Sequence, residues 1–229
     1  MKILIPPSEG KANIKPINIL FKDTDFIFKE QVKNIINTLG KLSDKDVLKT
    51  YGTTYEKSIY LNNLNTNAFN NKCIQSIYRY TGVVYKHLSY KTLDHNSKKY
   101  MNNNFLIFSG LFGLLSPLSL IPDYKLKMSA LKLYNYWNPF ITETLKQEDL
   151  IIDLLPQLHR KSYLRMTNTV YIDFMIMKDG EKKAAGHLGK TVKGKFIRYI
   201  CENKISKISD FKDFEYDGFH WDGISIVKN

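Results

Sequence analysis

The sequence contains few cysteines and no clustered metal ligands. Cys73 and Cys201 are the only two cysteines among the 229 residues, and neither belongs to a Cys-x-x-Cys pair. This excludes a disulfide framework and gives no support to a zinc site. The five histidines have no ligand spacing and form no His-Glu-x-x-His motif. We therefore expect no metal and no cofactor.

The sequence also lacks long hydrophobic runs. The apolar run at the start, within MKILIPPSEGK, is ended by Pro6 and Pro7 and is too short for the hydrophobic region of a signal peptide. No stretch reaches the roughly 20 apolar residues of a membrane-spanning helix. We therefore expect a cytoplasmic protein that does not enter a membrane.

Arginine is scarce although the chain is basic. Lysine and arginine together number 34 against 22 acidic residues, a formal net charge of +12, and only four of the basic residues are arginines. Such a surplus favours a polyanionic partner or an anionic substrate. An AT-rich genome, which enriches lysine, asparagine and isoleucine, explains the same composition without any binding function.

Three short apolar runs each end in a break, at residues 2–5, 105–108 and 150–155. Their length and β-branched content predict buried strands. The chain has 43% apolar residues and no repeat, low-complexity tract or linker. We therefore expect α/β architecture, in one mixed α/β domain over residues 1–229 with a central sheet flanked by helices.

Residues 43–64 predict a helical hairpin. Ser43 is placed as an N-cap, and Tyr51-Gly52-Thr53 supplies the turn between two short helices. The pattern LKTYGTTYEKS resembles a degenerate helix-hairpin-helix, an element whose turn offers backbone amides to a nucleic-acid phosphate. A plain pair of antiparallel helices explains the same residues.

The remaining elements follow from apolar periodicity and turn residues. Asp179-Gly180 is a strong turn signal after a long strand. We expect helices over residues 25–39, 67–80, 132–146 and 190–203, and strands over residues 169–177 and 223–227.

If the three early strands are parallel, the loops that leave them form one crevice. It would bring Ser8, Glu9 and Lys11 close to the loop at 109–110 and the segment 159–161. Neither Gly10-Lys11 nor Gly189-Lys190 is a P-loop, because the glycine required five positions earlier is missing in both.

The densest basic segment runs over residues 178–198, with seven basic residues against two acidic ones. Gly186 and Gly189 would let the backbone approach a ligand, and a helix that begins near Lys190 would add its N-terminal attraction for phosphate. Lys190 and Lys193 would then share a solvent-facing side of that helix. A merely solvated helix face competes with this interpretation.

Several segments carry a family resemblance in the same order along the chain: ILIPPSEGK, TGVVYKHL, FSGLFGLLSPLSLIPDYKLKM, LYNYW, DLIIDLLP and KKAAGHLGKTVKGKFIRYICENKI. Together, from Met1 to about Phe214, they resemble the YaaA family of bacterial peroxide-stress proteins. The resemblance implies a cytoplasmic mixed α/β protein with a helix-hairpin-helix element that binds duplex and branched DNA in a basic cleft. It also implies a role in limiting oxidative damage associated with free iron. The turn at Gly52 departs from the usual Pro-Gly-Ile-Gly form of that element.

Two hypotheses of function follow. In the first, the protein binds DNA through a cleft lined by basic residues: Lys11, Lys125, Lys127, Arg160, Lys161, Lys182, Lys183, Lys190 and Lys193. In the second, it is an enzyme that processes a nucleotide or nucleobase, with Glu9 as acid or base, Lys11 as the cation, and Ser8 beside them. A carboxylate in a basic cleft motivates the second hypothesis, because pure DNA binding does not need one.

Overall fold

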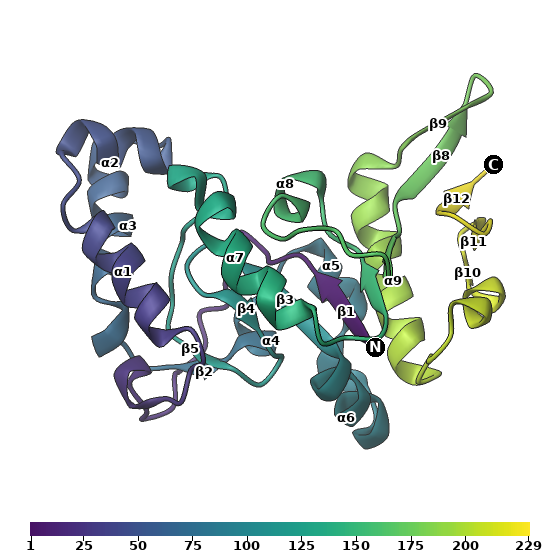
Figure 1. Ribbon diagram of the computed structural model, residues 1–229, viewed down its shortest axis with the longest axis horizontal. Coiled ribbons are helices and arrows are strands. Elements are labelled where there is room, and N and C mark those ends of the chain that lie inside the picture. The colour runs from purple at the N-terminus through teal and green to yellow at the C-terminus, as the bar shows by residue number, and fades with distance from the viewer.

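The computed structural model describes all residues, 1–229, and its central element is a five-stranded sheet (Figure 1). The strand order is β4-β3-β1-β6-β7. Only β4 runs antiparallel to its neighbour, and the other pairs are parallel. The strands are β1 (Lys2–Ile5), β3 (Phe105–Ser109), β4 (Gly113–Leu115), β6 (Ile151–Asp153) and β7 (Thr169–Tyr171). The three predicted early strands are confirmed, and they are parallel.

A second five-stranded sheet forms the opposite end of the molecule from the helices of residues 29–66 (Figure 1), with the order β10-β11-β12-β8-β9. Its strands are β8 (Phe174–Lys178), β9 (Glu181–Ala184), β10 (Glu215–Tyr216), β11 (Phe219–Trp221) and β12 (Ile226–Lys228). Asp179 and Gly180 both have positive φ and form the predicted turn between β8 and β9. A two-stranded sheet joins β2 (Ile74–Gln75) to β5 (Leu120–Ile121).

Helices cover these sheets and form the remaining layers, consistent with the predicted α/β class. They are α1 (Lys29–Leu39), α2 (Asp44–Tyr51), α3 (Tyr55–Thr66), α4 (Ser76–Arg79), α5 (Val83–Leu88), α6 (His95–Asn104), α7 (Leu133–Leu145), α8 (Gln157–Arg160) and α9 (Gly186–Glu202). None of them combines the length and the apolar character that a membrane crossing requires.

Three predicted elements were wrong in extent. Residues 67–80 are not one helix but a 3₁₀ turn, β2 and the short α4, because residues 74–75 pair with β5. Residues 169–177 are two strands, since the chain leaves the first sheet after β7 and enters the second at β8. The last long helix begins at Gly186 rather than near Lys190, so Gly186 and Gly189 lie inside α9.

Helix α9 joins the two sheets through a close crossing with α5. At Gly194 a Cβ atom would lie 2.4 Å from the carbonyl oxygen of Val84, so only glycine permits this approach. On the other side, the Phe196 ring packs 6.0 Å from that of Phe174 in the second sheet. The crossing fixes where the side chains of α9 lie relative to the end of β1.

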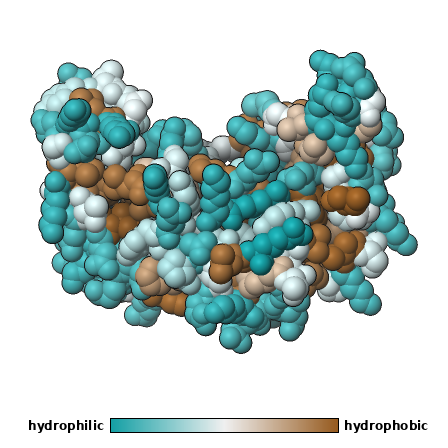
Figure 2. Space-filling model, turned by 45° about the horizontal axis from the view of Figure 1, so that its top comes forward, coloured by the Kyte–Doolittle hydropathy of each residue, from teal (hydrophilic) through white to brown (hydrophobic).

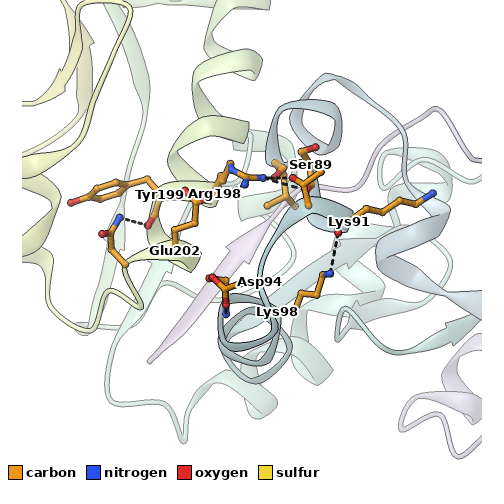
Figure 3. A network of polar contacts seen from close by, with 11 residues as sticks. Ser89, Lys91, Asp94, Lys98, Arg198, Tyr199 and Glu202 are labelled. Atoms are coloured by element: carbon orange, nitrogen blue, oxygen red, sulfur yellow. Dashed lines mark hydrogen bonds and ion pairs between the residues drawn. The ribbon is translucent and has the colours of Figure 1, made fainter.

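A polar network fastens the outer side of α9 to the segment between α5 and α6 (Figure 3). Arg198 donates to the carbonyls of Leu88 and Ser89 and to the Thr92 hydroxyl, at 3.2, 3.3 and 2.8 Å. It also pairs with Glu202 at 2.7 Å. Arg198, although part of the basic segment, therefore has a structural role.

Candidate nucleic-acid interface

The loops that leave β1, β3 and β6 meet at one edge of the first sheet. β1 lies between β3 and β6 and parallel to both, so the three carboxyl ends point the same way. The next strand of this sheet after β1 is β3, which lies on one side of β1, and the next strand after β6 is β7, which lies toward the opposite edge of the sheet. Open α/β sheets bind ligands at such a switch point, outside the carboxyl ends of the strands.

Two neighbouring clefts lie at this edge, and Ser8, Glu9 and His159 line both of them. The first, of about 160 Å³, also contacts residues 124–129. The second, of about 610 Å³, extends to the start of α5 and to α9. Figure 2 shows that this side of the molecule is hollowed between two raised lobes, formed by α2–α3 and by the β8–β9 hairpin. The only carboxylate in the two linings is that of Glu9. The linings also hold five lysines: Lys11, Lys125, Lys127, Lys190 and Lys193.

Lys11 lies in the first cleft, against two aromatic rings. Its Nζ is 4.6 Å from the ring centroid of Tyr124 and 5.0 Å from that of Tyr80, and it donates a 2.5 Å hydrogen bond to the Ser8 carbonyl. Burial lowers the pKa of Lys11 to about 8, and the nearby Asp123 opposes that shift only in part. The two tyrosine hydroxyls are 2.7 Å apart, and the Ser109 hydroxyl donates to that of Tyr124 at 2.9 Å.

Ser8 and Glu9 have different surroundings, although they are adjacent. The Ser8 hydroxyl is buried, accepts from the Gly82 N–H at 2.7 Å and donates to the Gly10 carbonyl at 3.0 Å. It therefore shapes the loop that follows β1. Glu9 is exposed and pairs with Lys127 at 3.4 Å. The structure thus brings all three candidate catalytic residues, Ser8, Glu9 and Lys11, to one cleft.

The loop that carries Lys125 and Lys127 is held by α3 and by the turn after β3. The buried Asn65 side chain accepts from the Lys125 N–H at 3.0 Å and donates to its carbonyl at 2.9 Å. At Gly110 a Cβ atom would lie 2.5 Å from the Leu126 carbonyl oxygen, so this turn needs glycine in order to let the loop come close. Lys125 is half-buried and Lys127 exposed.

Arg160 is occupied by carboxylates rather than free for a ligand. It binds Asp153 at 3.2 Å and Asp173 at 2.9 Å. Asp153 is fully buried and also accepts from the Leu155 N–H at 2.6 Å and from the Tyr163 hydroxyl. The network fixes the loop after β6, so Arg160 is a structural residue here. Lys161, which follows it, is exposed.

Lys190 and Lys193 line the second cleft one helical turn apart, but only Lys190 is exposed. Lys193 donates to the Leu154 carbonyl, and burial lowers the pKa of Lys193 to about 8. It is therefore not on a solvent-facing side of α9 as the sequence predicted. His159 faces the same cleft, and burial, followed by the charge of Lys193, lowers the pKa of His159 to about 4. Its Nδ1 has no hydrogen-bond partner.

Lys182 and Lys183 do not line either cleft. Both lie on β9, in the β8–β9 hairpin that projects away from the central sheet (Figure 1). Lys182 pairs with Asp222, and Lys183 pairs with Asp179 at 3.4 Å and with Glu181 at 3.9 Å. The sequence placed them with the cleft lysines because it did not reveal that β9 leads away from the central sheet.

Residues 1–224 match the family model described as "Peroxide stress protein YaaA". The chain belongs to the YaaA family of peroxide stress proteins. It is 32% identical to a UPF0246 protein of Francisella tularensis subsp. mediasiatica, an alignment that covers 96% of this chain and 94% of that protein. It is 31% identical to a UPF0246 protein of Francisella philomiragia, over 93% and 92% of the two chains. The resemblance inferred from the sequence segments is confirmed.

In this YaaA-family protein the predicted helical hairpin exists as α2 and α3. The Ser43 hydroxyl caps α2 by accepting from the Asp46 N–H at 3.3 Å, and Gly52 ends it in the left-handed region at φ 60°. Tyr51, the last residue of α2, accepts a 2.8 Å hydrogen bond from Asn65 of α3. The hairpin is therefore tied through Asn65 to the loop that carries Lys125.

Sequence reasoning missed the residues that organise this YaaA-family site from within. Asn65, Tyr80, Tyr124 and Asp153 are all buried. Tyr124 and Asp153 lie in segments that carry the family resemblance, but the resemblance gave neither of them a role in the site. Only Asp153 carries a usable signal, because a carboxylate at the end of an apolar strand needs a buried partner. No group of three or more His, Cys, Asp or Glu side chains in the structure is arranged to hold a metal ion.

Proposed function

We propose that this protein binds duplex or branched DNA through the two clefts at the carboxyl edge of its central sheet, and that this binding serves the peroxide stress response by limiting iron-associated damage to DNA. The observation that carries the proposal is the charge of the cleft linings, where five lysines face a single carboxylate. A concave surface of one charge sign attracts a polyanion and raises its association rate.

The lysines differ in what they offer a phosphate. Lys127 and Lys190 are exposed at the cleft rims, and Lys190 forms no salt bridge. Lys127 has only the exposed Glu9 as a partner, a pair that contributes little in water. These two side chains are the strongest candidates for phosphate contacts.

The α2–α3 hairpin supports the same proposal from one side of the hollow. The first backbone N–H groups of a helix have no partner within the helix, so the start of α3 after Thr54 offers donors to a phosphate. Its tie through Asn65 to Lys125 places the hairpin and the cleft in one connected unit. We propose that DNA contacts both.

The test is the double variant Lys127→Gln/Lys190→Gln, with affinity for a fluorescent duplex measured by anisotropy over a range of salt concentrations. If both lysines contact phosphates, the slope of log K against log salt becomes less steep by about 2, at about 0.9 for each phosphate. Lys99→Gln/Lys212→Gln is the matched control, since both residues are exposed lysines outside the clefts and the charge change is equal. Equal slopes for the two double variants would remove the clefts from the interface.

An enzyme that processes a nucleotide or nucleobase is the second candidate, favoured by the presence of Glu9, Lys11 and His159 in one cleft. Glu9→Gln separates the two functions. Stronger DNA binding, by about twofold for the loss of one exposed charge, supports DNA binding alone. Loss of a measurable turnover, with DNA binding unchanged, supports the enzyme.

A further inference from the structure

Lys11 is an unusual lysine for a phosphate contact. It lines the cleft of about 160 Å³ while its Nζ rests on the faces of Tyr80 and Tyr124, and no carboxylate lies within salt-bridge distance of it. A phosphate-binding lysine works best when it is exposed and fully protonated. Lys11 is neither, because burial lowers its pKa to about 8.

The surroundings of Lys11 suit a nucleophilic amine. With a pKa of about 8, about a fifth of the amine is unprotonated at pH 7.4, against roughly 0.1% for an ordinary lysine. A desolvated lysine amine attacks carbonyl carbons to form imines. The hydroxyls of Tyr80, Tyr124 and Ser109 form a hydrogen-bonded chain on the same two rings that hold the amine. Burial raises the pKa of both tyrosines, so these hydroxyls stay protonated, and the hydrogen-bonded chain can pass a proton on only if it takes one back.

We propose that the Lys11 amine captures the aldehyde of an abasic site in DNA as an imine. The proposal rests on the DNA-binding function above, which brings the sugar to the cleft. An abasic site is the aldehyde that DNA itself presents after base loss, and oxidative attack produces such sites. The cleft admits a sugar, and a damaged nucleotide without its base leaves the helical stack at the lowest cost.

The reaction balances without any oxidant or reductant. The nitrogen lone pair of Lys11 attacks C1′ of the ring-opened sugar, and the carbonyl oxygen takes up a proton to give a carbinolamine. In the same step the nitrogen releases its first proton to solvent. The hydroxyl then leaves as water with a proton from the tyrosine and serine hydroxyl chain, and the proton that remains on the nitrogen returns to that chain. The product is an imine between Nζ and C1′, plus one water, and hydrolysis reverses it.

The test is reductive trapping of the full-length protein on a fluorescent duplex that contains one abasic site, with cyanoborohydride as the reductant. We expect a covalent complex on a denaturing gel, which peptide mass mapping assigns to Lys11. Lys11→Arg keeps the charge but not the nucleophile and Lys11→Met removes both, so each should reduce the adduct at least tenfold. Lys99→Arg, at an exposed lysine outside the clefts, should retain it. Trapping should also increase with pH through about 8.

Binding of the same duplex, measured without reductant, separates the two proposals. A wild-type protein that binds the duplex and gives no adduct overturns the imine and leaves DNA binding intact. A protein that neither binds nor traps refutes the DNA-binding function, and the imine at an abasic site with it. An adduct that maps to Lys125 or Lys127 overturns the assignment to Lys11. The mapping uses the wild-type chain, so it stands even if a Lys11 variant fails to fold.

Discussion

His159 should make the protein less stable as the pH falls from 7 to 5. Its side chain is held between the two clefts with its Nδ1 unpartnered, and burial and Lys193 lower its pKa to about 4. In the unfolded chain the same histidine has a pKa of about 6.5. Between these two values the unfolded state binds a proton that the folded state does not, so stability falls as the pH falls.

The size of the effect follows from those two pKa values. Proton linkage gives a loss of about 2 kcal/mol in the free energy of unfolding between pH 7 and pH 5 from His159 alone. Lys11 and Lys193, with pKa values of about 8, are mostly protonated in the folded state and fully protonated in the unfolded state over this range, so they add little. Between pH 7 and pH 5 the change in the free energy of unfolding therefore reports on His159 rather than on the buried lysines of the clefts.

The assay is urea unfolding of the wild-type protein and His159→Gln at pH 7 and pH 5. Other groups whose pKa changes on folding, such as His87, act equally in both proteins and cancel. The variant should lose about 2 kcal/mol less than the wild type over the two pH units. Replacement of the exposed His187 by Gln is the control and should leave the wild-type difference unchanged. An equal pH dependence for the wild type and His159→Gln would refute the burial argument.

Three further substitutions test the packing around the clefts by urea unfolding. Gly194→Ala puts a Cβ atom 2.4 Å from the Val84 carbonyl oxygen and should cost about 1–3 kcal/mol, and an unchanged stability would contradict the close helix crossing. Asn65→Ala leaves the backbone groups of Lys125 unpaired and should cost about 1–3 kcal/mol, whereas the exposed Asn63→Ala should have little effect. Gly52→Ala places a side chain at φ 60° in open space and should cost about 1 kcal/mol from backbone strain alone, so a loss below a few tenths would argue against that turn.

The sequence predicted the parts of the fold that depend on local patterns. The three short strands, the Ser43 cap and the Asp179-Gly180 turn each have a local physical cause and were predicted correctly. The parallel direction of the strands was only assumed, and the structure shows it. The division of residues 169–177 between two sheets was missed. Alternation of apolar side chains reports a strand but not the sheet that the strand joins. Pairing with β5 likewise overrode the apparent helix at 67–80.

The candidate site was predicted in its location better than in its chemistry. Loops after parallel strands identify the edge of the sheet, and the structure has Ser8, Glu9 and Lys11 in one cleft at that edge. The environment of each lysine could not be predicted, because lysine is normally exposed and only tertiary packing buries Lys11 and Lys193. Of the two carboxylates that pair with Arg160, Asp153 carries a signal in the sequence, whereas Asp173 lies between β7 and β8 and carries none.

The central claim is that the clefts bind DNA, and one titration tests it most directly. The purified protein is titrated against fluorescent duplex, single-stranded and junction DNA at two salt concentrations, beside an unrelated protein of equal net charge. The account predicts tighter binding than the charge-matched protein, with a preference for duplex or junction over single strands and a loss of affinity at higher salt. Binding no tighter than that of the control, and equal for all three DNA forms, would contradict the claim that the clefts bind DNA. The net charge of +12 would then reflect the amino-acid composition of the chain rather than a DNA-binding function.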